Sequence, residues 1–155
     1  MKYIRMHQVE AEPMTRGDYN KKRGWEIPAN ENPADEGYFV TYPDGYISWC
    51  PKAQFEAAGR PCDGMTFGMA IEAMKRGKKV ARSGWNGKGM YLWILPESEI
   101  KLDWCKDQRL IEAFGNRDTL PCLGTVRMFT ADKKILTGWL ASQTDMLAED
   151  WQIVE

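Results

Sequence analysis

Residues typical of metal and covalent chemistry are scarce in this sequence. Its 155 residues include one histidine, His7, and four cysteines that form no C-x-x-C pair. Zinc sites draw on clustered Cys and His side chains at short spacing, so we expect no metal ion and no cofactor. We expect the cysteines to be small core residues; they are Cys50, Cys62, Cys105 and Cys122.

Long apolar runs and an excess of positive charge are also missing. No run approaches the roughly 18–20 apolar residues that span a bilayer, and the N-terminus lacks the signal-peptide pattern. The net charge of −1 gives no general attraction for DNA, RNA or an acidic membrane. We therefore expect a soluble cytosolic protein with reduced thiols and with neither nucleic acid nor membrane as partner.

What the sequence does contain is globular and rich in aromatic residues. Hydrophobic residues make up 43% and charged residues 28%, and there are seven tryptophans. Composition changes at residues 58–64, AAGRPCDG, which we interpret as a linker. We expect a small β-rich module over residues 1–60 and a ligand-binding domain over residues 65–155.

The N-terminal module is expected to contain one hairpin and one helix. Residues 37–42 and 46–49 read as strands around a Pro-Asp-Gly turn, and residues 51–58 as a helix that begins at a proline. Residues 13–36 are polar and hold three prolines, so we expect mostly loop there.

The second part shows sharper signals. Thr66 is a good N-cap for a helix over residues 67–76, which has apolar residues at helical spacing and Gly77 behind it. Strands are expected over residues 78–82, 90–95, 125–130, 135–141 and 151–154. A run at 109–114 is expected to be helical, and Ser142 to cap a short helix reaching Glu149. This order predicts an α+β fold with a mainly antiparallel sheet, one principal helix and a short C-terminal helix.

The first candidate site is the glycine turn SGWNGKG at residues 83–89. Glycines let backbone N–H groups approach a ligand, Lys88 offers charge to a phosphate, and Trp85 could stack on a purine. The alternative is that Trp85 packs on its own sheet and the glycines only shape a hairpin. The residues alone do not separate the two readings.

The second candidate is the GWLASQTD stretch at residues 138–145. A strand ends and a helix begins there, so unpaired N–H groups and polar side chains could bind an anion or a ribose. The alternative is that Ser142 caps the helix, with Asp145 at the third position of a capping box, and that nothing binds.

Catalytic chemistry has little support. His7 lies in the less structured part, and Asp145 with Glu149, four residues apart, is more often a solvated face than an acid–base pair. Binding is better supported than turnover.

Two long stretches carry a family resemblance: MTFGMAIEAMKRGKKVARSGWNGKGMYLWILP and GWLASQTDMLAEDWQIV. They resemble the second type of Thoeris anti-defence protein, a family of small phage proteins. The resemblance covers residues 65–155 and includes both candidate motifs. It implies a non-enzymatic sponge, acting in the cytoplasm of the infected host, that withholds the glycocyclic ADP-ribose of Thoeris systems. In some members it also withholds cyclic dinucleotides of CBASS.

The resemblance further implies a homotetramer with ligand pockets between subunits. Carried over by motif, the ligand-binding residues are Trp85, Asn86, Met90, Trp139, Ser142, Gln143 and Asp145. To these the chemistry of the two motifs adds Lys88 and Thr144. Their roles follow from chemistry: tryptophan for the adenine face, and polar groups for ribose and phosphate.

The N-terminal segment EGYFVTYPDGYISWCPKAQFEAA resembles an accessory module found on various phage proteins. Two other functions stay open. One is an enzyme that cleaves the same messengers with Asp145 and Glu149, and the other is a protein–protein inhibitor module. The sequence does not show which nucleotides bind, whether two classes bind at once, or the oligomer's symmetry.

Overall fold

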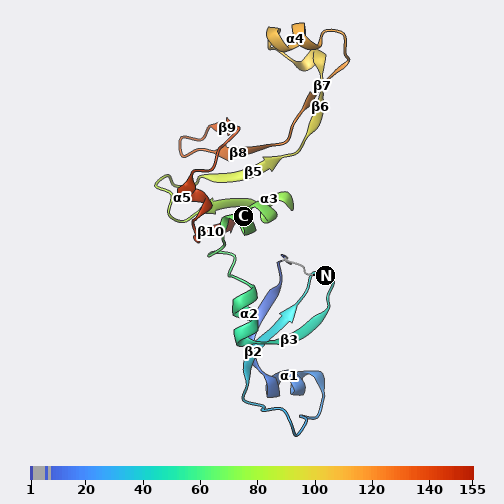
Figure 1. Cartoon of the computed structure of the whole chain (residues 1–155), viewed down its shortest axis with the longest axis vertical. Coiled ribbons are helices and arrows are strands. Elements are labelled where there is room, and N and C mark those ends of the chain that lie inside the picture. The colour runs from blue at the N-terminus through green and yellow to red at the C-terminus, as the bar shows by residue number, and fades with distance from the viewer. Residues whose placement is uncertain (2–5, 7) are drawn as a thin grey trace. The chain divides into compact units, whose positions relative to one another are not determined.

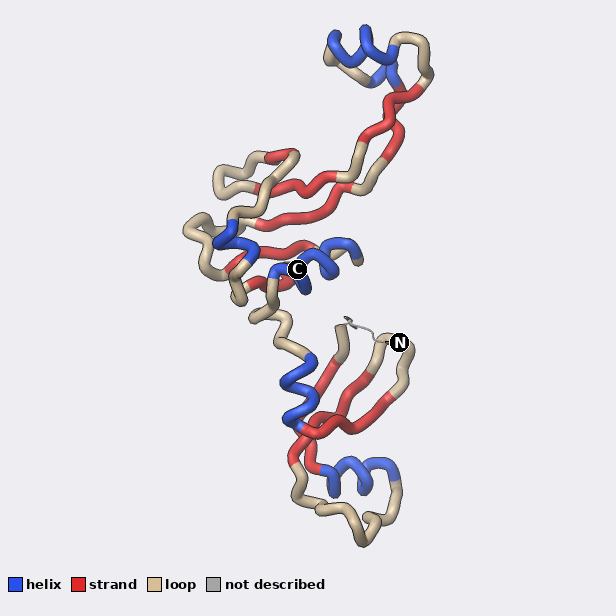
Figure 2. The backbone as a smooth tube through the Cα atoms, viewed as in Figure 1, coloured by secondary structure: helices blue, strands red, loops and turns tan. Residues whose placement is uncertain are grey.

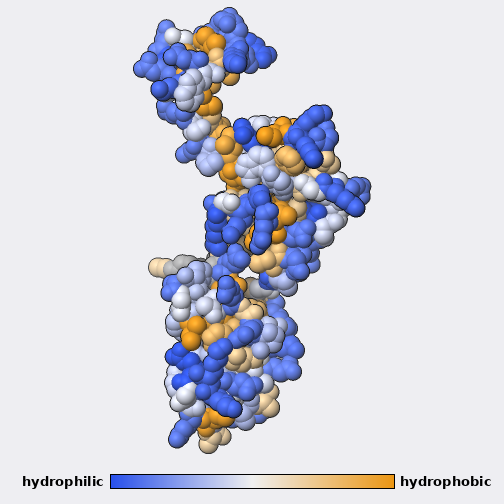
Figure 3. Space-filling view, turned by 180° about the vertical axis from the view of Figure 1, so that it is seen from behind, coloured by the Kyte–Doolittle hydropathy of each residue, from blue (hydrophilic) through white to orange (hydrophobic). Residues whose placement is uncertain are grey.

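The computed structural model describes residues 1, 6 and 8–155, so His7 lies outside the described residues. The chain divides into two compact units, Met1–Pro61 and Cys62–Glu155, each of which we describe by itself. No helix among the described residues is long and apolar enough to cross a membrane. On the face shown in Figure 3, hydrophobic residues reach the surface of both units between hydrophilic ones.

The N-terminal unit is a three-stranded antiparallel sheet with two helices (Figure 1). Its elements are β1 (Glu10–Thr15), α1 (Arg16–Arg23), β2 (Glu36–Thr41), β3 (Ile47–Pro51) and α2 (Lys52–Ala58). The expectation of mostly loop over residues 13–36 was wrong, because α1 lies inside it and β1 ends inside it. The Thr15 hydroxyl accepts from the Asp18 N–H at 3.1 Å, and Gly24 ends α1 with φ of 71°.

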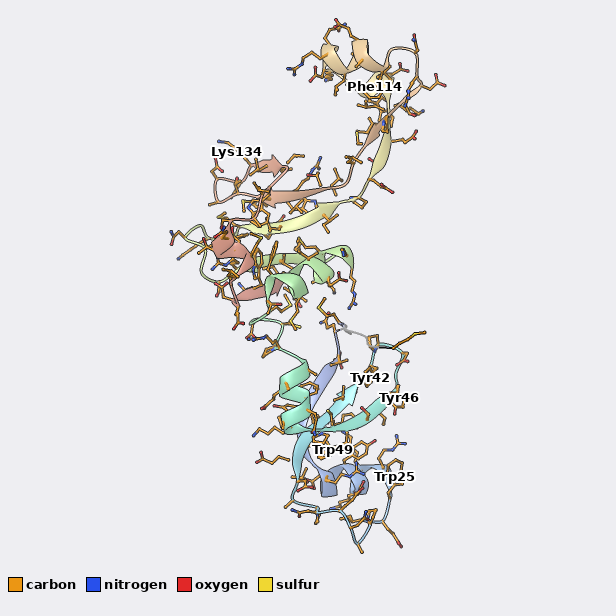
Figure 4. All side chains as sticks on the ribbon, in the orientation of Figure 1. Trp25, Tyr42, Tyr46, Trp49, Phe114 and Lys134 are labelled. Atoms are coloured by element: carbon orange, nitrogen blue, oxygen red, sulfur yellow. The ribbon has the colours of Figure 1, made fainter. Side chains whose placement is uncertain are left out.

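Trp49 lies between this sheet and the start of α1 (Figure 4). Its indole N–H donates to the Met14 carbonyl at 2.9 Å, and the Arg16 guanidinium stands 5.1 Å from its ring centroid. Gly37 on β2 must be glycine, since a Cβ there would overlap the Trp49 ring. Trp49 thus links β3 to the start of α1. The buried side chains of the unit include Tyr19, Asn20 and Val40.

The C-terminal unit is a five-stranded antiparallel sheet in the order β10-β4-β5-β8-β9. The strands are β4 (Lys79–Arg82), β5 (Tyr91–Leu95), β8 (Thr125–Phe129), β9 (Ile135–Thr137) and β10 (Trp151–Val154). Helix α3 (Phe67–Lys75) begins at the expected cap, with the Thr66 hydroxyl accepting from the Met69 N–H. It packs its buried Ala70 and Met74 against buried sheet residues, among them Val80 and Leu92. The α+β fold with an antiparallel sheet is confirmed.

A paired extension continues from β5 and β8. It consists of β6 (Ser98–Lys101), the 3₁₀ turn η1 (Leu102–Trp104), α4 (Gln108–Phe114) and β7 (Thr119–Cys122), and Figure 2 shows β6 and β7 leading to α4. We call residues 98–122 the arm. Its helix was expected, and its two strands were not.

Three other expectations need correction. The strand expected over 135–141 stops at Thr137, because Gly138 takes φ of 85°, outside the extended region. The last helix, α5 (Gln143–Met146), ends before Glu149. The cysteines are not core residues: Cys62 is exposed and the other three are half-buried.

Candidate functional site: an aromatic and carboxylate cluster

The two candidate motifs, about 55 residues apart in sequence, meet in the C-terminal unit. The glycine turn connects β4 to β5, and the second motif connects β9 to α5. The ring centroids of Trp85 and Trp139 lie 6.2 Å apart, with their planes at 63°. The Trp85 indole N–H donates to Asp145 Oδ1 at 3.1 Å. The motifs therefore form one continuous site.

Trp85 is half-buried in an aromatic cluster and does not stand free at the tip of its turn. Its ring lies 5.5 Å from Trp151, which is fully buried, and Trp139 lies 6.3 Å from Trp151. Phe67, at the start of α3, contacts Trp139 and Trp151 at 6.4 Å and 5.3 Å. These edge and tilted contacts are the arrangements that aromatic rings favour. Packing on its own unit thus accounts for much of the Trp85 surface.

Asp145 is the polar centre of the cluster. Its Oδ1 accepts from Trp85 Nε1 and from Arg82 Nη1 (2.9 Å), and its Oδ2 accepts from the Ser142 backbone N–H (3.1 Å) and hydroxyl (2.7 Å). Burial by itself would raise the pKa of Asp145, but the hydrogen bonds from Ser142, Arg82 and Trp85 outweigh it and lower the pKa to about 2. The capping box of Ser142 and Asp145, which belongs to the alternative to ligand binding at this motif, is present.

Arg82, which the sequence reading did not single out, joins this centre to a second carboxylate. Its Nε donates to Asp150 Oδ1 at 2.8 Å, while Asp150 Oδ2 accepts from the Gly84 N–H at 2.8 Å. These contacts, Arg82 above all, lower the pKa of Asp150. A usable signal did exist, because strand alternation puts Arg82 on the same side as buried Val80, where a charge needs a partner.

The charges of this network do not suit an anion. One guanidinium faces two ionised carboxylates, so the three side chains together carry −1, and the Arg82 side chain is only 16% exposed. A phosphate would have to find its positive partner outside the network. Lys88 in the glycine turn is an exposed cation of that kind.

The other expected ligand-binding residues are mostly accessible. Asn86, Lys88, Ser142, Gln143 and Thr144 are exposed, whereas Met90 is half-buried and packs on the core. The structure thus joins Trp85, Trp139, Ser142 and Asp145 through direct contacts. It leaves Asn86, Lys88, Gln143 and Thr144 at the surface of the same two motifs.

Large apolar side chains stand exposed around α5. Leu140 is 89% and Leu147 82% exposed, and Met146 lies between them in sequence at 47%. These three side chains belong to α5 or flank it, and their surface is available for contact with another molecule.

The geometry offers little to acid–base catalysis. A general acid or base works best with a pKa near the operating pH, whereas Asp145 has a pKa of about 2 and both its oxygens accept hydrogen bonds. Among the described residues, no group of three or more His, Cys, Asp or Glu is placed to hold a metal ion.

A hollow of about 460 Å³ in the N-terminal unit is lined by residues that include Trp49, Lys52 and Glu56. Lys52 is paired with Glu36 at 2.8 Å, and Glu56 accepts from the Tyr38 hydroxyl at 2.9 Å. We assign no site there.

Comparison with known proteins shows a family match within the C-terminal unit and a similar phage protein. Residues 65–154 match the model of the Tad2-like family, described as the Thoeris anti-defense 2-like domain. The chain is also 43% identical over 91 residues to a protein of Bacillus phage SP01 called Thoeris anti-defense 2. This alignment covers 58% of the chain and 94% of the phage protein.

Proposed function

Because the chain belongs to the Thoeris anti-defense 2-like family, we propose that it binds and sequesters cyclic nucleotide immune messengers without degrading them. The family and the phage relative support an anti-defence role. The messenger we propose first is glycocyclic ADP-ribose of Thoeris systems, with cyclic dinucleotides of CBASS as a second class. The place of action is the cytoplasm of the infected host.

The observation that carries the proposal is the meeting of the two motifs at Trp85 and Trp139. Each half-buried indole keeps part of its surface for a base, and stacking on an aromatic side chain contributes roughly 1–3 kcal/mol per base in nucleic-acid complexes. Lys88 supplies the positive charge for a phosphate, and Asn86, Gln143 and Thr144 supply hydrogen bonds to ribose and base. Ser142 keeps its hydroxyl in the capping box, and Met90 adds apolar contact.

Assembly into a homotetramer completes the proposal. Leu140 and Leu147, which flank α5, are the apolar side chains that a second copy would cover. A pocket closed between copies excludes water and strengthens its hydrogen bonds. Nanomolar affinity, about −12 kcal/mol, is what competition with an effector requires.

The enzymatic alternative needs a proton donor or acceptor near neutral pH. Asp145, with a pKa of about 2, stays ionised far below neutral pH. This favours binding over turnover. A protein–protein inhibitor module stays a second candidate, since the exposed leucines would suit a protein partner as well.

The test is capture and release. The protein is mixed with glycocyclic ADP-ribose, freed of unbound ligand by filtration, and heat-denatured, and the released nucleotide is identified. Intact messenger in stoichiometric amount is the expected result. Altered nucleotide would make the protein an enzyme. Retention of neither this messenger nor cyclic dinucleotides would direct the search to a protein partner.

Surface variants then test the site without disturbing its packing. Lys88→Gln and Asn86→Ala change exposed side chains and should weaken retention at least tenfold. Lys75→Gln removes another exposed cation, which pairs with Glu72 on α3, and should leave retention unchanged. Equal retention by all three variants would show that the glycine turn does not contact the ligand.

A further inference from the structure

We propose that Arg82 is a positioning residue of the binding site: through Asp145 and Asp150 it fixes the Trp85 indole and the glycine turn in the orientation that binds ligand. This inference rests on the proposed function. It adds Arg82, which lies just before the glycine turn and is not among the expected ligand-binding residues. Arg82 acts without touching the ligand.

Arg82 connects two acidic residues that are separate in sequence. The planar guanidinium holds two carboxylates from different segments, with Nη1 on Asp145 Oδ1 at 2.9 Å and Nε on Asp150 Oδ1 at 2.8 Å. Rigid, forked donors of this kind fix orientation as well as distance. Asp145 and Asp150 flank the connection between α5 and β10, so one side chain sets where both carboxylates stand.

Each of the two carboxylates also accepts a hydrogen bond from the glycine turn. The oxygen of Asp145 that accepts from Arg82, Oδ1, also accepts from the Trp85 indole N–H at 3.1 Å. The other oxygen of Asp150, Oδ2, accepts from the Gly84 backbone N–H at 2.8 Å. The side chain of Trp85 and the backbone before it are therefore held by the same pair of acids.

The Arg82 guanidinium is poorly placed to contact a ligand directly. Asp145 and Asp150 already neutralise the Arg82 charge, and the side chain is 16% exposed, so a phosphate gains little by approaching it. Without Arg82, two carboxylates would face each other with no cation between them. They would move apart, and the acceptor of the indole N–H would move with them.

The experiment compares Arg82→Gln, Arg82→Lys and the control Lys75→Gln in the full chain. Two quantities are measured: the affinity for glycocyclic ADP-ribose, and the NMR resonance and hydrogen exchange of the Trp85 indole N–H. The resonance is assigned by its loss in Trp85→Phe. A structural role alone would lower stability without changing this indole signal at temperatures where the protein is fully folded.

The expected result is a shifted Trp85 indole resonance with at least tenfold faster exchange in Arg82→Gln, together with at least tenfold weaker binding. Arg82→Lys keeps the positive charge but loses the forked donors of the guanidinium. Its affinity and its indole exchange rate should lie between those of Arg82→Gln and the wild type. Lys75→Gln should match the wild type. If Arg82→Gln does not fold, Arg82→Lys and Asp150→Asn carry the test, both with a shifted indole signal and weaker binding.

Two results would overturn the inference. One is wild-type affinity in Arg82→Gln. The other is lost affinity with an unchanged Trp85 indole signal, which would make Arg82 a direct ligand contact. If the wild-type protein itself retains no messenger, the proposed function fails, and the binding role of Arg82 fails with it. The indole signal then still decides whether Arg82 orients Trp85.

Discussion

The fully buried indole of Trp151 donates its N–H to the backbone carbonyl of Asp145 at 3.0 Å. This bond joins α5 to the first residue of β10. Trp151 also contacts the rings of Phe67, Trp85 and Trp139. The packing of the unit and the orientation of the site thus depend on the same side chain.

Replacing Trp151 by phenylalanine should therefore destabilise the C-terminal unit. The change removes a buried hydrogen bond and part of a ring surrounded by other rings, at a cost of about 2–4 kcal/mol. Urea denaturation gives the free energy of unfolding. Trp104→Phe is the matched control, because Trp104 is 71% exposed on the arm, and it should change stability by about 0.5 kcal/mol or less. Similar losses in both variants would contradict the packing described.

The stability of the protein should fall in acid through Asp145. Its folded pKa of about 2 lies below the unfolded value of about 3.9. Its contribution, about 2 kcal/mol, is therefore fully present above pH 4 and is lost as the pH falls toward 2. Denaturation curves of the wild type and Asp145→Asn should differ at pH 6 and converge between pH 4 and 2. A difference that stays constant over that range would mean that the Asp145 carboxylate is not held as described.

Gly87 in the glycine turn should not tolerate a side chain. A Cβ there would overlap the Met90 sulfur and come within 3.0 Å of the Ala131 Cβ. Gly87→Ala should cost about 1–3 kcal/mol through overpacking. Met90→Ala alone should also cost stability, because Met90 packs on the core. Since most of the overlap is with Met90, the double variant should lose less than the sum of the two single losses. Thermal unfolding of both single variants and the double variant measures the coupling. Strict additivity would show that the two side chains do not compete for space.

Residues 62–155 should fold and bind without the N-terminal unit. The family model matches residues 65–154, all of which lie in this unit, and the 43% identical phage protein is covered over 94% of its own length by 91 residues of the chain. A protein truncated before Cys62 should unfold cooperatively and retain messenger within about threefold of the full chain. Loss of cooperative unfolding would show that the C-terminal unit needs contacts with residues 1–61.

Where local signals and tertiary packing agree, the sequence predicts this structure well. Thr66 and Ser142 cap helices as expected, and residues 151–154 form the expected strand. Helix α1 went unpredicted because its run RGDYNKKR holds a single large apolar residue, Tyr19, although the Thr15 cap and Gly24 were readable. The arm strands are short and pair only with each other, so no apolar alternation marks them.

The candidate site was only partly predictable for a similar reason. Both motifs could be read locally, since glycines and a helix cap leave local signatures. Strand alternation could indicate that Arg82 needs a partner but not which one, because Asp145 and Asp150 are 63 and 68 residues away in sequence. Whether Trp85 faces a ligand or its own unit is likewise decided by Trp139 and Trp151, which only the folded chain brings close.

Backbone hydrogen bonds join the two ends of the segment that matches the family model. Met65 and Trp151 exchange backbone hydrogen bonds at 2.8 Å and 3.1 Å, and the Ile153 N–H donates to the Cys62 carbonyl at 3.0 Å. The first residues of the unit and its last strand thus lie side by side. A domain built this way can accept an added segment at its front as a tether, with no strand of its sheet displaced. Exchange of the first 61 residues among related proteins would then be compatible with an unaltered sheet.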